Sequence, residues 1–75
     1  MNKAVDRKAL RKFGQRLNSL RKQKNLSLRE LSYACNVDNS KISKIEKGLV
    51  NITFNTIIQL AEALEVKVSE LMDID

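Results

Sequence analysis

Hydrogen-bonding side chains recur along residues 39–47 with a spacing that gathers them on one side of a helix. At 100° per residue, this polar side lies opposite Ile42 and Ile45. The polar side consists of Ser40, Ser43, Lys44 and Lys47, with Asn39 at its edge near the helix start. Asparagine can pair bidentately with adenine, lysine can donate to guanine O6 and N7, and serine can serve several bases. The pattern predicts a helix that reads DNA base edges, although an ordinary amphipathic surface helix would show the same polarity.

Two short helices joined by three residues are predicted around this segment. Ser27 and Glu30 have the spacing of a capping box, which favours a helix start at this point. Asn36 tolerates a left-handed backbone and can end that helix, and Asp38 can cap the next one. Residues 27–48 therefore have the helix-turn-helix arrangement, in which the second helix is free to enter a major groove.

The remainder of the chain also has helical periodicity, and the scarcity of Gly and Pro favours helices throughout. Three further helices are expected at residues 6–24, 53–64 and 69–72. Gly14 weakens the prediction for the first half of the first of these. The helix that begins at the Thr53 cap is expected to bury the apolar stripe Phe54, Ile57, Ile58, Ala61 and Leu64.

Together these elements predict an all-α, compact five-helix domain at residues 6–75, preceded by a flexible basic arm at residues 1–5. Cys35 is the single cysteine and there is no histidine, which excludes an internal disulfide, the common zinc sites and imidazole-dependent triads. No apolar run is long enough to span a membrane, and the N-terminus lacks a signal-peptide pattern. We expect a cytoplasmic protein with no catalytic residues, no cofactor, no metal and no membrane partner.

Charge is divided unequally along the chain. Residues 1–47 hold 13 of the 14 basic residues and four acidic ones, a formal charge of +9. Residues 48–75 hold one basic residue and five acidic ones, a formal charge of −4. This asymmetry favours a polyanionic partner for the first part, with a plain solvated surface as the alternative.

Three segments in the right order resemble one known family. They read FGQRLNSLRKQKNLSLREL, NVDNSKISKIEKG and NTIIQLAEALEVKVSEL, and the resemblance from Phe13 to Met72 covers about four-fifths of the chain. The chain is similar to the phage-repressor/Cro class of helix-turn-helix domains, the XRE family. The resemblance implies a lambda-repressor-like DNA-binding domain of five helices, which usually acts as a homodimer on near-palindromic operators of double-stranded DNA.

The resemblance also implies which residues meet DNA. Base contacts are implied for Asn39, Ser40, Ser43 and Lys44. Phosphate contacts are implied for Ser27, Leu28, Arg29, Lys47, Gly48 and Asn51, and we add the neighbouring cation Lys41. Leu28 stands where the family often has Gln, so any phosphate contact there must come from backbone N–H or from Arg29. The family often has Gly at three helix ends, where this chain has Asn25, Asn36 and Glu65. Asparagine suits such an end, whereas Glu65 raises the expectation that its helix ends differently.

Arg21 and Glu46 are predicted to form a partly buried structural ion pair. Each lies at the edge of an apolar helix face, where an unpaired charge would be costly. The resemblance also pairs an arginine with a glutamate at these positions. Cys35 shares the inner face of its helix with Leu28 and Leu31, and we expect it to act as a small core hydrophobe.

The C-terminal third has more apolar side chains than a small core obviously requires: Val66, Val68, Leu71, Met72 and Ile74. They suggest a self-complementary dimer face, with simple core closure as the alternative. The favoured function is sequence-specific DNA binding by a transcriptional regulator, with repression the favoured outcome. The alternative is an antitoxin or adaptor module whose main partner is a toxin or another protein.

Overall fold

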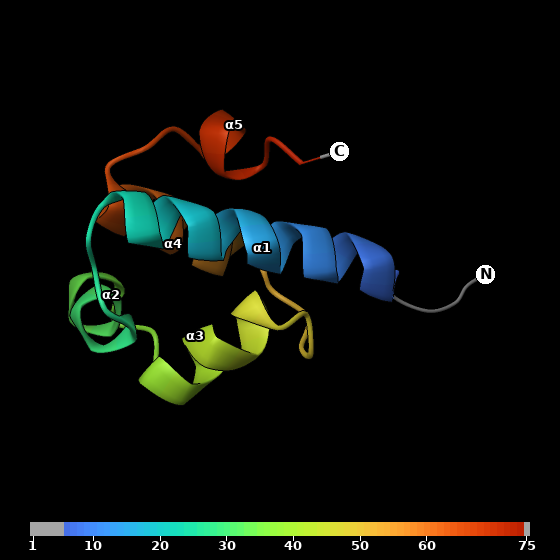
Figure 1. Ribbon diagram of the computed structural model, residues 1–75, viewed down its shortest axis with the longest axis horizontal. Helices are drawn as coiled ribbons and strands as arrows, with labels where there is room; N and C mark the ends of the chain where they lie inside the picture. Colours follow the sequence, from blue (N-terminus) through green and yellow to red (C-terminus); the bar gives the residue numbers. More distant parts are fainter. Residues whose placement is uncertain (1–5, 75) are drawn as a thin grey trace.

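Five helices form the domain in the computed structural model, which describes residues 6–74 (Figure 1). They are α1 (Arg7–Gln23), α2 (Leu28–Cys35), α3 (Asn39–Glu46), α4 (Phe54–Leu64) and α5 (Val68–Leu71). The predicted all-α, five-helix fold is confirmed, and the described residues contain no strand. The arm expected at residues 1–5 lies outside the described residues.

The helix starts follow the capping residues predicted from the sequence. Asp6 accepts hydrogen bonds from the first turn of α1, including one of 2.9 Å from Lys8 N. Ser27 Oγ accepts from Glu30 N at 3.0 Å, while Glu30 Oε1 accepts from Ser27 N at 2.8 Å, which completes the capping box. Thr53 Oγ1 likewise accepts from the first turn of α4. These caps are short-range interactions and so depend on few other parts of the fold.

Residues in the left-handed conformation lie at the C-terminal ends of three helices. Asn25, Asn36 and Glu65 each have φ of 59°. The expectation that Glu65 would change the end of α4 is wrong, because this residue adopts the conformation that glycine usually supplies there. The bond of 3.0 Å from Val66 N to the Ala61 carbonyl then closes the turn.

Gly14 lies inside an unbroken α1, so the expected weakness of this half of the helix is also wrong. The glycine is buried against the end of α3. A Cβ at this position would stand 2.5 Å from the carbonyl oxygen of Ile45 and would also meet that of Glu46. The missing side chain therefore allows the backbones of α1 and α3 to approach closely.

All five helices contribute to one hydrophobic core. Its buried members are Phe13, Leu17, Leu20, Leu31, Cys35, Val37, Ile42, Ile45, Ile57, Leu60, Ala61, Leu64 and Leu71. Cys35 is a free, buried thiol as predicted, and burial raises its pKa. Phe54 was expected in this core, but its side chain is 69% exposed, so that prediction is wrong. The residue is the first of α4, where the chain is still entering from the loop.

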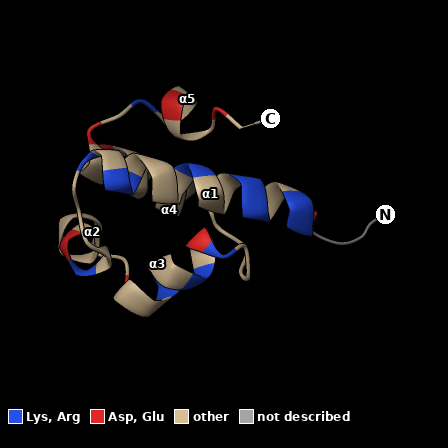
Figure 2. Cartoon of the chain, in the orientation of Figure 1, with Lys and Arg blue, Asp and Glu red and all other residues tan. Residues whose placement is uncertain are grey.

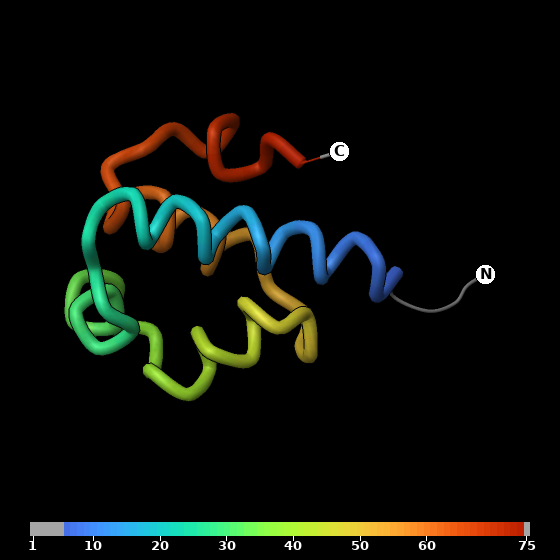
Figure 3. Tube along the Cα trace, viewed as in Figure 1, coloured from blue at the N-terminus to red at the C-terminus, as the bar shows by residue number. Residues whose placement is uncertain are grey.

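α1 separates two layers of the molecule. Figure 3 shows α2 and α3 on one side of α1 and α5 on the other. Arg16 Nε fixes the second layer by donating to the Glu70 carbonyl oxygen at 2.9 Å. The outer side of α3 is consequently left clear of the C-terminal part of the domain.

Candidate nucleic-acid interface

A tight turn fixes the angle between α2 and α3. Asn36 ends α2 in the left-handed conformation, and Asp38 caps α3. Between them, the side chain of Val37 is buried in the core. The apolar anchor in the middle of the turn holds α3 in place relative to α2, as a helix-turn-helix requires.

α3 divides into a buried face and an outward face. Ile42 and Ile45 are almost fully buried, as predicted. The residues predicted to read bases all come from the other face: Ser40 and Lys44 are exposed, and Asn39 and Ser43 are half-buried. The helix is thus fixed to the core by one side and presents hydrogen-bonding groups on the other.

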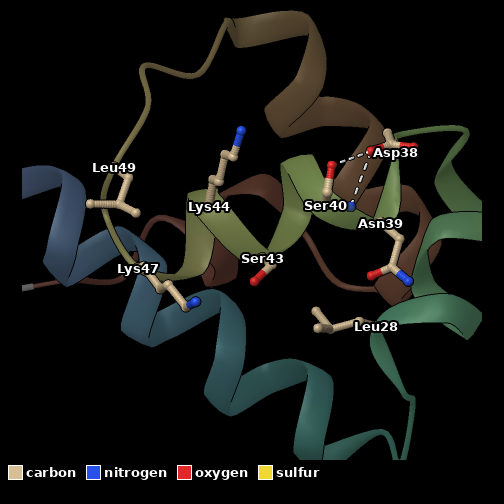
Figure 4. Close-up of a pocket in the computed structure, with 8 residues that line it drawn as sticks. All are labelled: Leu28, Asp38, Asn39, Ser40, Ser43, Lys44, Lys47 and Leu49. Carbon is tan, nitrogen blue, oxygen red and sulfur yellow. Dashed lines mark hydrogen bonds between the residues drawn. The ribbon is translucent and has the colours of Figure 1, made fainter.

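An open concavity of about 670 Å³ lies against this outward face (Figure 4). It brings together the four predicted base-reading residues and Lys47. The complete lining is Leu28, Asp38, Asn39, Ser40, Ser43, Lys44, Lys47 and Leu49. Leu49 was missed by the sequence analysis.

Ser40 has a local partner that the sequence analysis also missed. Its hydroxyl donates to Asp38 Oδ2 at 2.6 Å, and its backbone N–H donates to the same oxygen at 3.1 Å. The bond from the hydroxyl, followed by that from the backbone, lowers the pKa of the Asp38 carboxyl. Because the hydroxyl proton is engaged, Ser40 is left with lone pairs to accept a hydrogen bond from a base.

The residues predicted to contact phosphate lie at the two ends of the helix-turn-helix, except for Lys41, which lies on α3. Arg29, Lys41, Lys47 and Asn51 are exposed, and so is Ser27. Helix geometry gives the N–H groups of residues 28 and 29 no partner within their own helix, because both belong to its first turn. These groups therefore suit a phosphate ligand.

Gly48 is the exception among the predicted phosphate contacts. It is buried, and its N–H donates to the Ile45 carbonyl at 3.0 Å, so the predicted contact has no free donor. Its φ is +74°, and a Cβ there would stand 2.6 Å from Arg11 Cγ. Gly48 instead turns the chain at the end of α3 and allows the turn to pack on α1.

The predicted ion pair is confirmed and is bidentate. Arg21 Nε donates to Glu46 Oε2 at 2.7 Å, and Arg21 Nη2 donates to Oε1 at 3.1 Å. Asn18 Nδ2 adds a bond of 2.8 Å to Glu46, and Arg21 Nη1 donates to the Leu26 carbonyl at 2.9 Å. The bond to Glu46 is the main cause that raises the pKa of Arg21. This network joins α1 to the last turn of the helix that presents the polar face.

Charge follows the same division as the layers. Figure 2 shows mainly basic residues along α1 and α3, apart from Glu46 at the end of α3, while α5 and the connection from α4 hold acidic residues and a single lysine, Lys67. The described residues include no group of three or more His, Cys, Asp or Glu that could hold a metal ion. Within the same residues, no helix has the length and apolar character needed to cross a membrane.

The turn between α2 and α3 is short, and α3 has an outward polar face with exposed cations around it. These features define a small helix-turn-helix DNA-binding protein. The sequence pattern of a helix-turn-helix family matches residues 17–71. The chain belongs to this family, in the XRE-type class expected from its sequence, and it is a DNA-binding transcriptional regulator.

Similar proteins are found among regulators. The chain is 34% identical over 62 residues to control protein C.BamHI of Bacillus amyloliquefaciens, an alignment that covers 81% of this chain and 76% of the relative. The crystal structure of the restriction-modification controller protein C.AhdI from Aeromonas hydrophila is similar at a TM-score of 0.81 and 40% identity, covering 83% of this chain and 94% of that one. The crystal structure of the clp gene regulator ClgR from C. glutamicum is similar at a TM-score of 0.80 and 25% sequence identity. The match covers 92% of this chain and 86% of that one. These regulators favour DNA binding over the adaptor alternative.

Proposed function

We propose that the protein represses transcription by occupying a near-palindromic operator as a homodimer. The observation that supports this most strongly is the division of α3 into a face fixed in the core and an outward face of hydrogen-bonding groups. Two protomers would place these helices in successive major grooves about 34 Å apart. Occupation of a promoter by such a dimer blocks access by polymerase. The likeness to two proteins described as a control protein and a controller protein supports a regulatory role.

Different groups on α3 have different parts in this proposal. Asn39 and Lys44 supply donors for base edges, and Ser43 can both donate and accept. Ser40 acts as an acceptor, because its proton is held by Asp38. An acceptor at this point matches the exocyclic amino group of cytosine or adenine in the major groove.

Phosphate contacts set the position of the protein on the duplex. Lys41 and Lys47 are exposed cations on and beside α3, and Arg29 and the first N–H groups of α2 lie at the other end. Asn51 and the hydroxyl of Ser27 complete this set. Such contacts add affinity that is independent of sequence and depends on salt.

The homodimer is proposed to form through the C-terminal part of the domain. Leu71 is fully buried in its own protomer, so this member of the predicted dimer face belongs to the core instead. Val66, Val68 and Ile74 are half-buried, and Met72 is 41% exposed. The segment that holds these residues, α5 with its flanking loops, lies on the side of α1 away from α3 (Figure 1), so pairing there would leave the polar face of α3 free.

Binding to selected and random duplexes across a salt series tests the function. We expect a tight selected site and a steep fall of affinity with salt, since each phosphate neutralised by a cation contributes about −0.9 to the logarithmic slope. Lys44→Ala should relax specificity at one base position by about 1–3 kcal/mol. Lys67→Ala is the matched control, because Lys67 is an exposed lysine in the layer away from α3. Affinity that ignores both salt and sequence would overturn the proposal.

Sedimentation of the free protein and of its operator complex tests the dimer. Met72→Glu should give a monomer that binds a complete operator more weakly than the wild type and a half-site equally well. The control is Tyr33→Glu, because Tyr33 is 77% exposed on α2 and lies outside the proposed dimer face. A wild-type protein that is monomeric both free and on the operator would contradict the homodimer.

A further inference from the structure

Two leucines line the concavity at opposite ends of the polar face of α3. Leu28 is the first residue of α2, and Leu49 follows the turn that ends α3. Figure 4 shows Leu28 beside Asn39, and Leu49 at the other end beyond Lys44 and Lys47. The surface that we assign to base reading therefore has an apolar group at each end.

The backbone of Leu49 is held against α3 although its side chain is free. The Leu49 N–H donates to the Lys44 carbonyl oxygen at 3.0 Å. The Gly48 N–H donates to the Ile45 carbonyl oxygen, also at 3.0 Å. These two bonds form the Schellman motif that closes the helix. The Leu49 side chain is 55% exposed and is not among the residues that pack on the core. Leu49 therefore has a fixed backbone position and an accessible apolar side chain.

Leu28 is held at the other end by the start of α2. The capping box between Ser27 and Glu30 sets the direction in which the chain enters the helix. One part of the Leu28 side chain packs on the core, and another part lines the concavity with Asn39 and Ser43. Core packing thus holds Leu28 beside the polar groups on α3.

The chemistry of a leucine limits what it can contact on DNA. It cannot donate to a phosphate or to a polar base edge. The apolar group that bases present in the major groove is the C5-methyl of thymine. We propose that Leu28 and Leu49 contact thymine methyl groups, so that each operator half-site has a thymine beside the base read by Asn39 and another beyond the base read by Lys44. This inference rests on the proposed function.

Replacing thymine by uracil tests the contact, because uracil lacks only the methyl group and pairs in the same way. In a selected operator, each thymine is replaced in turn and the affinity of the wild-type protein is measured. We expect a loss of about fourfold at two positions in each half-site, which corresponds to about 0.8 kcal/mol for one buried carbon group. This scan requires no protein variant and so does not depend on the folding of one.

Two variants then assign each methyl group to its leucine. Leu28→Ala should remove the uracil effect at the position beside the Asn39 contact and keep the other, and Leu49→Ala should do the reverse. Tyr33→Ala is the control, because this exposed side chain does not line the concavity and should leave both effects intact. Thermal unfolding of each variant checks that it is folded.

Several results would overturn the inference while leaving the proposed function intact. One is a tight, salt-dependent selected site at which no thymine can be distinguished from uracil. Another is a uracil effect that persists unchanged in Leu28→Ala or Leu49→Ala, which would exclude that leucine. A third is an equal loss of affinity for thymine and uracil duplexes in either variant, which would assign its side chain to the sugar backbone. Failure to select any duplex would instead contradict the proposed function itself.

Discussion

Arg21 Nε lies 2.7 Å from Glu46 Oε2, in a contact that joins α1, the longest of the described helices, to the last turn of α3. The two side chains are only 11% and 8% exposed. Each charge is therefore satisfied mainly by the other side chain and by neighbouring polar groups, with little contact with solvent. Because the opposite face of α3 is the one that we propose reads base edges, the same pair helps to fix the position of that face.

Removal of either member of this pair should destabilise the fold. Arg21→Ala and Glu46→Ala are each expected to lower the free energy of unfolding by about 3 kcal/mol, because each leaves the other charge buried without its partner. Urea or thermal unfolding measures the change. Lys22→Ala is the control, since this exposed neighbour on α1 should change stability by no more than about 0.5 kcal/mol. Unchanged stability in both alanine variants would show that the pair is not structural.

Gly14→Ala should destabilise the protein, which is the opposite of what helix propensity alone predicts. In an isolated helix this substitution would gain about 1 kcal/mol. Here the added Cβ would stand 2.5 Å from the Ile45 carbonyl oxygen and would have to separate α1 from α3. We expect a net loss of about 1–3 kcal/mol in the free energy of unfolding. Ser19→Ala, at an exposed position on the same helix, should be neutral or slightly stabilising. A more stable Gly14→Ala variant would refute the close approach.

Glu65→Gly should make the protein more stable. Glu65 has φ of 59°, a left-handed conformation that costs a residue with a Cβ about 1–2 kcal/mol. Glycine removes this cost but loses more entropy on folding, so the expected net gain is about 0.5–1 kcal/mol. Glu62→Gly is the matched control because Glu62 is also exposed but lies within α4, where glycine should cost about 1 kcal/mol. Equal destabilisation by both changes would contradict this account.

Local interactions explain which parts of the structure could be predicted from the sequence. The capping box at Ser27 and the cap at Asp38 depend on residues a few positions apart, so their spacing was sufficient. The same holds for the outward face of α3, because the helical period alone places its polar residues opposite Ile42 and Ile45. The ion pair between Arg21 and Glu46 joins distant segments. It could be predicted because each charge lies at the edge of an apolar helix face and because the family resemblance pairs an arginine with a glutamate at these positions.

The errors came from contacts between distant segments or from competition within a turn. Gly14 looked like a weak point because its partner, the end of α3, is remote in the sequence. Phe54 fitted the apolar period of α4, yet it is the first residue of the helix, and at this end its side chain is exposed to solvent. Gly48 matched a phosphate-binding position, but closing the helix uses its N–H. Leu49 was missed because its importance comes from the concavity, which only the fold creates.

The bond from Ser40 to Asp38 predicts a measurable change in titration. The Ser40 hydroxyl, 2.6 Å from Oδ2, is the main cause that holds the pKa of Asp38 below its ordinary value of 3.8. Ser40→Ala removes this donor, so the Asp38 titration followed by NMR should move up towards the ordinary value. Ser69→Ala, an exposed serine on α5, is the control and should leave that titration unchanged. An unchanged Asp38 midpoint in Ser40→Ala would show that the hydroxyl does not donate to this carboxylate.

The same bond has a predictable effect on acid stability. Because the pKa of Asp38 is lower in the folded protein than in the unfolded chain, its ionised form favours folding. This contribution is fully present above the unfolded pKa and is lost as the pH falls through the folded one. Urea unfolding at pH 5 and pH 3 should therefore show a smaller acid-induced loss in Asp38→Asn than in the wild type. Asp73→Asn is the control for removal of an exposed carboxylate, and an equal reduction in both variants would mean that the Asp38 cap has no specific part in acid stability.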